Sequence, residues 1–304
     1  MSQRELKNVP ASVRARLLNE ARASGDSYDQ VLQYFAIERF LYRLAQTEWA
    51  DRLIVKGAIM LRAWGTPLGR PTRDIDFLGN IDNSPEAVER AVQECLAVEY
   101  PDDGLVFDQN VETTEINVMD RYPGVRVVVR GNLDGGTLKL QLDIGIDDAV
   151  VPDPEWVEYP TLLDLEAPRV LAYQPVTALA EKFETIVSHG LANSRLRDYY
   201  DLWLLPTLRS YEGPEVSASL SATFNHRGNA LPTDVPPGLS KAFFGEPANQ
   251  AAWRSFLSNR RVEAPPDLED VCEGIIAFVT PPAAAAASGS SFSSTWNPSS
   301  GWSG

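Results

Sequence analysis

The sequence RDIDF at residues 73–77, preceded by KGA at residues 56–58, decides the fold. Apolar β-formers alternate with the two acids, which predicts a strand with Asp74 and Asp76 on one face and the apolar side chains in the core. Two carboxylates on one face repel each other unless a cation lies between them. Such oxygen pairs suit Mg²⁺, which proteins usually hold with one or two carboxylates plus substrate phosphates. The pattern indicates phosphoryl or nucleotidyl transfer, although a solvated edge strand would show it too.

A later stretch supplies a third carboxylate. In residues 137–146, leucine and isoleucine occupy every second position, with Lys139, Gln141 and Asp143 between them. This alternation predicts a half-buried strand with Asp143 on its polar face. An exposed strand acid without a function would give the same pattern. A turn signal, Asp-Gly-Gly at residues 134–136, separates this strand from a Val-rich strand at 125–130.

Hydrophobic periodicity predicts the remaining elements. Helices are expected across residues 10–48, where Arg39, Tyr42 and Arg43 would face solvent or a polyanion. We also expect a loop-rich stretch at residues 212–250, a strand at 53–55, and helices at 58–64, 86–97, 178–189, 195–205 and 268–278.

Composition suggests two folded parts and a tail. Residues 1–150 are predicted to form one domain that includes the N-terminal helices. After a Pro-rich linker, residues 160–280 are predicted to form a second, mostly helical domain. Residues 281–304 carry no charge and are rich in Ala, Ser, Gly and Pro. We therefore expect these residues to be a disordered tail, because they offer little apolar surface to bury.

Charge and cysteine content narrow the function classes. The 304 residues are 44% hydrophobic and 23% charged, as in an ordinary globular protein. A net charge of −15 argues against a general nucleic-acid coat but allows one RNA end to be held in a local basic groove. Two cysteines give neither a disulfide framework nor a thiolate metal cluster. No signal peptide or membrane span is expected, so we expect a cytoplasmic protein.

The order of these signals resembles the nucleotidyltransferase superfamily that includes DNA polymerase β. More narrowly, the chain is similar to the AbiEii/AbiGii nucleotidyltransferase toxins, including the MenT-like group. Ala58 departs from the superfamily pattern, which usually has Gly or Ser at that position. The resemblance covers roughly residues 28–205, and the segments that carry it are residues 32–44, 56–61, 70–77, 180–182 and 193–202.

This resemblance implies an α+β fold, in which a mixed sheet flanked by helices precedes a helical C-terminal region. Asp74 and Asp76 would hold Mg²⁺, and Asp143 would complete the metal site and accept the proton of the attacking hydroxyl. Backbone N–H groups near Gly57 and Ala58 would approach the triphosphate of an NTP. Lys56 and Arg73 would offset the charge of the triphosphate.

A second motif of the family lies further along the chain. It contains Lys182 on one helix and Arg195, Asp198 and Asp201 at the start of the next. Because Asp198 and Asp201 are three residues apart, they share a helix face. The resemblance implies catalytic roles for Lys182 and Asp198 and a nucleotide-binding role for Arg195. One of the two acids would instead support Lys182 or Arg195 through an ion pair.

The implied function is that of a toxin from a toxin–antitoxin system. It would transfer a nucleoside monophosphate from an NTP to RNA, at the 3′ acceptor end of a tRNA, and a cognate antitoxin would be a further partner. Two alternatives stay open: nucleotidylation of a small molecule or a protein hydroxyl, and a nucleotide-binding module without turnover. Five arginines would line the RNA groove: Arg39, Arg43, Arg62, Arg70 and Arg73.

Overall fold

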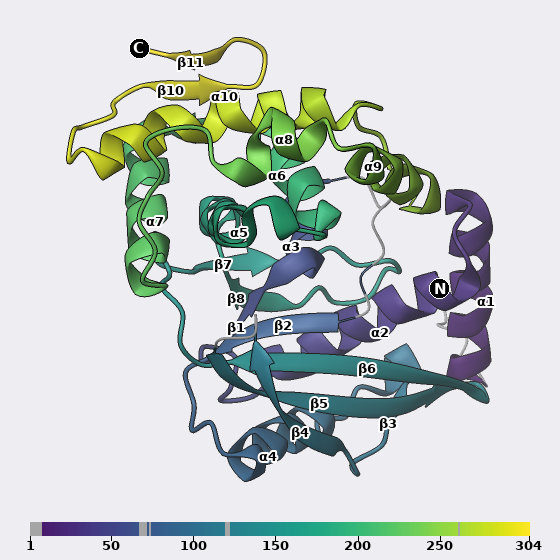
Figure 1. The fold of residues 1–304 in the computed structure, drawn as a ribbon. Coiled ribbons are helices and arrows are strands. Elements are labelled where there is room, and N and C mark those ends of the chain that lie inside the picture. The colour runs from purple at the N-terminus through teal and green to yellow at the C-terminus, as the bar shows by residue number, and fades with distance from the viewer. Residues whose placement is uncertain (1–7, 67–71, 73, 119–121, 261) are drawn as a thin grey trace. The chain divides into compact units, whose positions relative to one another are not determined.

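The chain divides into two compact units, which are described separately (Figure 1). This computed structural model describes residues 8–66, 72, 74–118, 122–260 and 262–304. The predicted border between domains fell at residues 150–160. The structure instead assigns residues 155–172 to the first unit, because they form two strands of its sheet. Unit 1 comprises residues 1–66, 71–147 and 155–172, and unit 2 comprises residues 67–70, 148–154 and 173–304.

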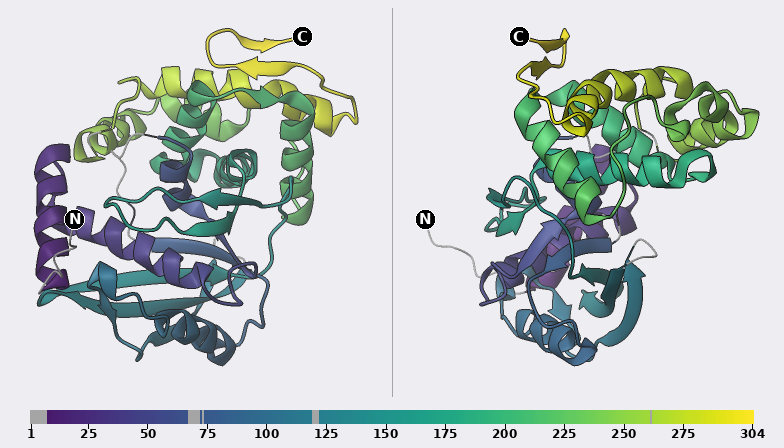
Figure 2. Two further views of the ribbon diagram at one scale, coloured as in Figure 1. Left: turned by 180° about the vertical axis from the view of Figure 1, so that it is seen from behind. Right: turned by 60° about the vertical axis from the view of Figure 1, so that its left-hand side comes forward.

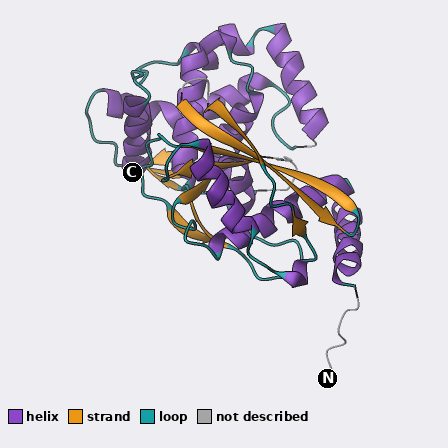
Figure 3. Cartoon of the chain, turned by 90° about the horizontal axis from the view of Figure 1, so that it is seen from below, coloured by secondary structure: helices purple, strands orange, loops and turns teal. Residues whose placement is uncertain are grey.

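Within the described residues, unit 1 is built on an eight-stranded mixed sheet. Its order is β3-β5-β6-β2-β1-β8-β7, and β4 pairs with β5. The β1–β2 and β5–β6 pairs are antiparallel, whereas the β2–β6 and β1–β8 pairs are parallel. Figure 3 shows the twist of these strands. The bounds are β1 Leu53–Lys56, β2 Asp74–Gly79, β3 Val106–Phe107, β4 Glu112–Val118, β5 Tyr122–Leu133, β6 Gly136–Gly145, β7 Glu155–Glu158 and β8 Arg169–Ala172.

Helices cover the apolar face of this sheet. The helices α2 (Tyr28–Ala45) and α4 (Pro85–Leu96) pack against each other and against the strands, as Figure 2 shows from behind. The ring of Phe40 on α2 meets Phe77 of β2 at a centroid distance of 6.4 Å. Because successive strand residues alternate between faces, Asp74 and Asp76 lie on the face opposite to α2. The predicted mixed sheet flanked by helices is confirmed.

The ends of the helices follow local sequence. Ser27 is the N-cap of α2 and Ser84 is the N-cap of α4. The side chain of each serine accepts a hydrogen bond from the backbone N–H three residues further on. Pro85 at the first position of α4 lacks the N–H that a helix start leaves unpaired. The other helical segments of unit 1 are α1 Val9–Ser24, η1 Gly57–Ile59, α3 Met60–Ala63 and η2 Pro101–Asp103.

The prediction that Arg39, Tyr42 and Arg43 face solvent or a polyanion is wrong. All three side chains are buried in unit 1. The Arg39 Nε lies 3.0 Å from an oxygen of Glu38, and the Arg43 Nη1 lies 2.6 Å from an oxygen of Asp103. A buried guanidinium requires such a carboxylate, because an unpaired charge in the interior is strongly destabilising. Neither Arg39 nor Arg43 is therefore available to line an RNA groove.

Unit 2 is mostly helical, as predicted for the C-terminal region. The helices α5, α6, α7 and α10 pack together, with Phe183 against Phe224 and Tyr199 stacked on Phe243. The stretch 212–250, expected to be loop-rich, in fact contains α7, α8 and the start of α9. The bounds are α5 Pro175–His189, η3 Gly190–Ala192, α6 Leu196–Leu208, β9 Tyr211–Glu212, α7 Gly213–His226, η4 Pro237–Leu239, α8 Lys241–Phe244, α9 Pro247–Arg260 and α10 Leu268–Ala287.

The expectation of a disordered tail at residues 281–304 is also wrong. Helix α10 extends to Ala287, and strands β10 (Thr295–Asn297) and β11 (Gly301–Ser303) form a hairpin that pairs with β9. Trp302 stacks on Phe278 of α10 at 5.5 Å, and its indole N–H donates to the Phe278 carbonyl. Ordering this segment costs conformational entropy, which its few apolar residues would not offset alone. Packing of its aromatic rings against α10 offsets that cost.

By length and composition, α10 is the one described helix that could cross a membrane. The buried core helix of a globular unit meets the same criteria. In this structure Val271, Ile275 and Phe278 are fully buried against other elements of unit 2. The contacts within unit 2 therefore account for the apolar sequence of α10.

Candidate functional site

A row of four charged side chains crosses the sheet of unit 1. Lys56 on β1 is in register with Asp76 on β2, Asp76 with Asp143 on β6, and Asp143 with Arg126 on β5. Residues directly opposite on paired strands project from the same face. Asp74, two residues before Asp76, projects from that face too. The strands therefore gather three carboxylates between two cations on one side of the sheet.

Gly57 contacts this row through its backbone. Its φ is +76°, a conformation that residues with a Cβ rarely adopt. A Cβ built at this position would overlap Asp76, lying 2.9 Å from the carboxyl carbon. Glycine thus lets the start of η1 approach the Asp76 carboxylate closely. Ala58 follows in η1 and is half-buried, so its methyl group fits here.

Arg126 donates a hydrogen bond to each carboxylate oxygen of Asp143. Arg126 Nε donates to Oδ1 and Nη2 to Oδ2, each at 2.8 Å. This hydrogen bonding with Asp143 raises the pKa of Arg126, and the negative charges of Asp74 and Asp76 raise it further. Gln141 Nε2 adds a longer contact of 3.4 Å to Asp143 Oδ2. The Arg126 side chain is 40% exposed, and the Asp143 side chain is 16% exposed.

Arg126 was not among the residues selected from the sequence, yet a signal for it exists. Asp134 and Gly135 both have positive φ, as a two-residue hairpin turn requires. Such a turn pairs Leu133 with Gly136, and counting back along both strands places Arg126 opposite Asp143. The register was therefore implicit in the predicted turn.

Two of the three carboxylates fit a divalent cation in this arrangement, and the third does not. Asp74 and Asp76 supply the oxygen ligands that Mg²⁺ prefers, and Gly57 lets the backbone approach the Asp76 carboxylate where a Cβ would clash. Both oxygens of Asp143, in contrast, accept hydrogen bonds from Arg126. Among the described residues, no group of three or more Asp, Glu, His or Cys side chains is arranged to hold a metal ion. The residues fit a metal at Asp74 and Asp76.

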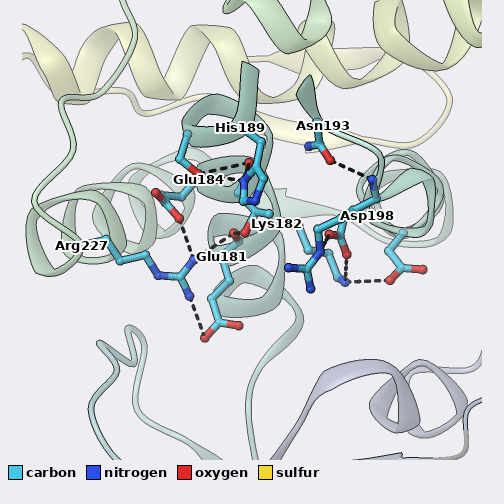
Figure 4. A network of polar contacts seen from close by, with 11 residues as sticks. Glu181, Lys182, Glu184, His189, Asn193, Asp198 and Arg227 are labelled. Atoms are coloured by element: carbon cyan, nitrogen blue, oxygen red, sulfur yellow. Dashed lines mark hydrogen bonds and ion pairs between the residues drawn. The ribbon is translucent and has the colours of Figure 1, made fainter. Parts of the chain in front are cut away.

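Lys182, Arg195 and Asp198 form a separate cluster within unit 2 (Figure 4). Lys182 Nζ on α5 lies 3.2 Å from Asp198 Oδ1 and 2.7 Å from Asp201 Oδ2, both on α6. Arg195 Nε lies 3.1 Å from the second oxygen of Asp198. Burial alone would raise the pKa of Asp198, but the charges of Lys182 and Arg195 outweigh it and lower the pKa. Asp201 is fully buried.

A second buried network in unit 2 was missed by the sequence analysis. Arg227 lies 2.7 Å from Glu184 and 3.7 Å from Glu181 (Figure 4). It also lies 3.6 Å from Asp148. Burial lowers the pKa of Arg227, but these carboxylates more than compensate and raise it. No local sequence pattern indicates Arg227, because its partners come from distant segments of the chain.

Other predicted residues have different positions. Arg62 lies over the rings of Tyr34 and Tyr159, with its guanidinium carbon 5.7 and 5.9 Å from their centroids. Arg70 and Arg73 lie outside the described residues. The five arginines proposed from the sequence therefore do not form a common groove among the described residues.

Comparison with known proteins identifies the class and then the family. The nucleotidyl transferase family model "AbiEii toxin, Type IV TA system" matches residues 39–276. The chain therefore belongs to the AbiEii family of nucleotidyltransferase toxins from type IV toxin–antitoxin systems, which implies a cognate antitoxin.

Two solved structures are similar to the chain. A candidate nucleotidyltransferase from H. pylori is 13% identical, with a TM-score of 0.43, and the match covers 86% of this chain and 96% of that one. JHP933 from Helicobacter pylori is also 13% identical, with a TM-score of 0.45 and coverage of 86% and 94%. Among curated proteins, none matches the chain.

Proposed function

We propose that this protein transfers a nucleoside monophosphate from an NTP to the 3′ acceptor end of a tRNA, with Mg²⁺ at Asp74 and Asp76. The observation that carries the proposal is the register of Lys56, Asp76 and Asp143 on one sheet face, with the Gly57 backbone against Asp76. A binding module without turnover would not need a third carboxylate in that row.

The reaction assigns a role to each residue of the row. The acceptor hydroxyl attacks the α-phosphorus, a new O–P bond forms, and the bond to the departing pyrophosphate breaks. Asp143 would complete the metal site and accept the hydroxyl proton, and Lys56 and the backbone at Gly57 and Ala58 would face the triphosphate. When bound, the divalent metal stabilises the charge on the attacking and leaving oxygens. Arg73, which lies outside the described residues, would offset more of the triphosphate charge.

The cluster in unit 2 has a proposed role of its own. Lys182 and Arg195 carry the positive charge needed to bind phosphates of the nucleotide or RNA. Asp198 contacts both cations, so it positions them relative to each other. The buried carboxylate of Asp201 anchors Lys182, and we assign it structural support.

An RNA end suits a chain with a net charge of −15. Each phosphate contact needs a local cation, and an acidic protein can supply a few of them but not a broad basic surface. A single-stranded 3′ end offers its hydroxyl while presenting few phosphates. We place this activity in the cytoplasm, where tRNA and NTPs are found.

The test is transfer from each α-³²P-NTP in the presence of Mg²⁺ and total tRNA. Asp76→Asn keeps the shape of the side chain but removes its charge, and it should lower transfer at least about a hundredfold. Glu115→Gln is the matched control, because Glu115 is an exposed acid on β4 whose removal should leave transfer unchanged. Label on protein or small molecules instead of tRNA would support the alternative acceptors. A variant whose melting temperature collapses would not test the metal role.

A further inference from the structure

Arg126 contacts the carboxylate of Asp143, which the proposed reaction needs to be accessible. Both Asp143 oxygens accept hydrogen bonds from the Arg126 guanidinium, and this bidentate geometry gives strong and directional contacts. The same oxygens would have to bind a metal or receive a proton. The two arrangements use the same oxygen lone pairs and so exclude each other.

The charges of the row explain why a cation lies there. Asp74, Asp76 and Asp143 project from one face, and their mutual repulsion would be large without a nearby positive charge. Arg126 interacts electrostatically with all three acids. It therefore supplies part of the charge neutralisation that a divalent cation would otherwise provide.

We propose that Arg126 is a built-in counter-cation that competes with the divalent metal for Asp143, and this rests on the proposed function of the row. In the arrangement seen here, Arg126 holds Asp143. When metal and nucleotide bind, Arg126 releases the carboxylate and its guanidinium turns toward solvent or the phosphates. Arg126 thus sets the metal affinity of the site.

Exposure makes this exchange feasible. The Arg126 side chain is 40% exposed, so the released guanidinium regains hydration. Partly exposed ion pairs are weak because water solvates both charges well. The competition should therefore change metal affinity modestly, by about three- to fivefold, since a fully exposed pair contributes roughly this much.

The direct test is Mn²⁺ binding, measured by electron paramagnetic resonance with the full chain and no nucleotide. Arg126→Gln should tighten binding about three- to fivefold. Arg130→Gln is the matched control: Arg130 lies on the same strand and face and pairs with Glu112 at 2.7 Å, outside the row. It should leave the affinity unchanged. Arg126→Lys keeps the charge but loses the bidentate contact, so it should tighten Mn²⁺ binding less than Arg126→Gln does.

A double-mutant cycle separates competition for Asp143 from the general loss of a positive charge. In an Asp143→Asn background, Arg126→Gln should no longer tighten Mn²⁺ binding, because the contested carboxylate is gone. A gain of the same size in that background would overturn the competition model. Unchanged or weaker Mn²⁺ binding by Arg126→Gln, relative to Arg130→Gln, would overturn it as well.

The two proposals fail in different ways. If the wild type labels tRNA but Arg126→Gln leaves Mn²⁺ affinity unchanged, only the role of Arg126 is overturned. If neither the wild type nor any variant binds Mn²⁺, the metal site itself is overturned, and the role of Arg126 with it. Weaker NTP binding together with unchanged Mn²⁺ affinity would assign Arg126 to the phosphates and overturn the competition.

Discussion

In unit 1, Arg126 reaches Asp143 on a sheet face that is partly open to solvent, whereas in unit 2 Lys182 reaches two buried carboxylates, those of Asp198 and Asp201. The Arg126 side chain is 40% exposed, but the Lys182 side chain is only 15% exposed. Similar contacts therefore have different consequences. A buried pair is strongly destabilising to break, because one charge is left without water or a partner, whereas a partly exposed pair can open and let a ligand in.

The largest stability effect is expected in the buried cluster. Asp201→Asn removes a fully buried carboxylate 2.7 Å from Lys182 and leaves that ammonium with less compensation. We expect the free energy of unfolding to fall by about 3 kcal/mol, at the low end for a broken buried pair because Asp198 remains. Urea unfolding measures it, with Asp234→Asn, at an exposed loop position, as control. A loss no greater than the control's would contradict the comparison.

A pH effect is expected from the buried pair Glu38–Arg39 in unit 1. Burial raises the pKa of Glu38 from 4.5 to about 7. Between those values the folded chain binds more protons than the unfolded chain, so the free energy of unfolding falls as pH rises. The slope is at most about 1.4 kcal/mol per pH unit for one group.

Glu38→Gln should flatten this dependence between pH 5 and 7, because glutamine does not titrate. Urea midpoints measured at intervals of half a pH unit give the slope for each variant. The exposed Glu48→Gln should keep the slope of the wild type. Equal slopes in all three proteins would show that Glu38 is ionised throughout this range.

The smallest stability effect is expected at the partly exposed pair. Arg126→Gln should change the free energy of unfolding by less than about 1 kcal/mol, since water solvates both partners. Urea unfolding under the conditions used for Asp201→Asn allows a direct comparison. A loss comparable to that of Asp201→Asn would mean that Arg126 is a structural residue and not an exchangeable counter-cation.

The parts of the site that follow local periodicity could be predicted from the sequence. Alternation placed Asp74 and Asp76 on one face of β2 and Asp143 on the polar face of β6, and the structure has this arrangement. The mixed sheet and the helical region after it were implied by the family resemblance. Their proposed catalytic roles stay predictions.

Partnerships between distant residues could not be predicted in the same way. Arg43 pairs with Asp103, sixty positions away, and no local pattern distinguishes it from a solvated arginine. The tail was misjudged for a related reason: Trp296 and Trp302 are partly buried by their contacts with Phe278, which also contacts Tyr211. Composition describes what a segment contains but not what the rest of the chain offers it.

The turn at Asp134 and Gly135 lies roughly 25 Å from Asp143, counted along the strand. Surface turns ordinarily tolerate insertions. Here one inserted residue would shift the pairing of β5 against β6 by one residue, and the β5 side chains would turn to the other face of the sheet. Arg126 would then leave Asp143 although neither residue had changed. The length of this remote turn is therefore under the same constraint as the charged row itself.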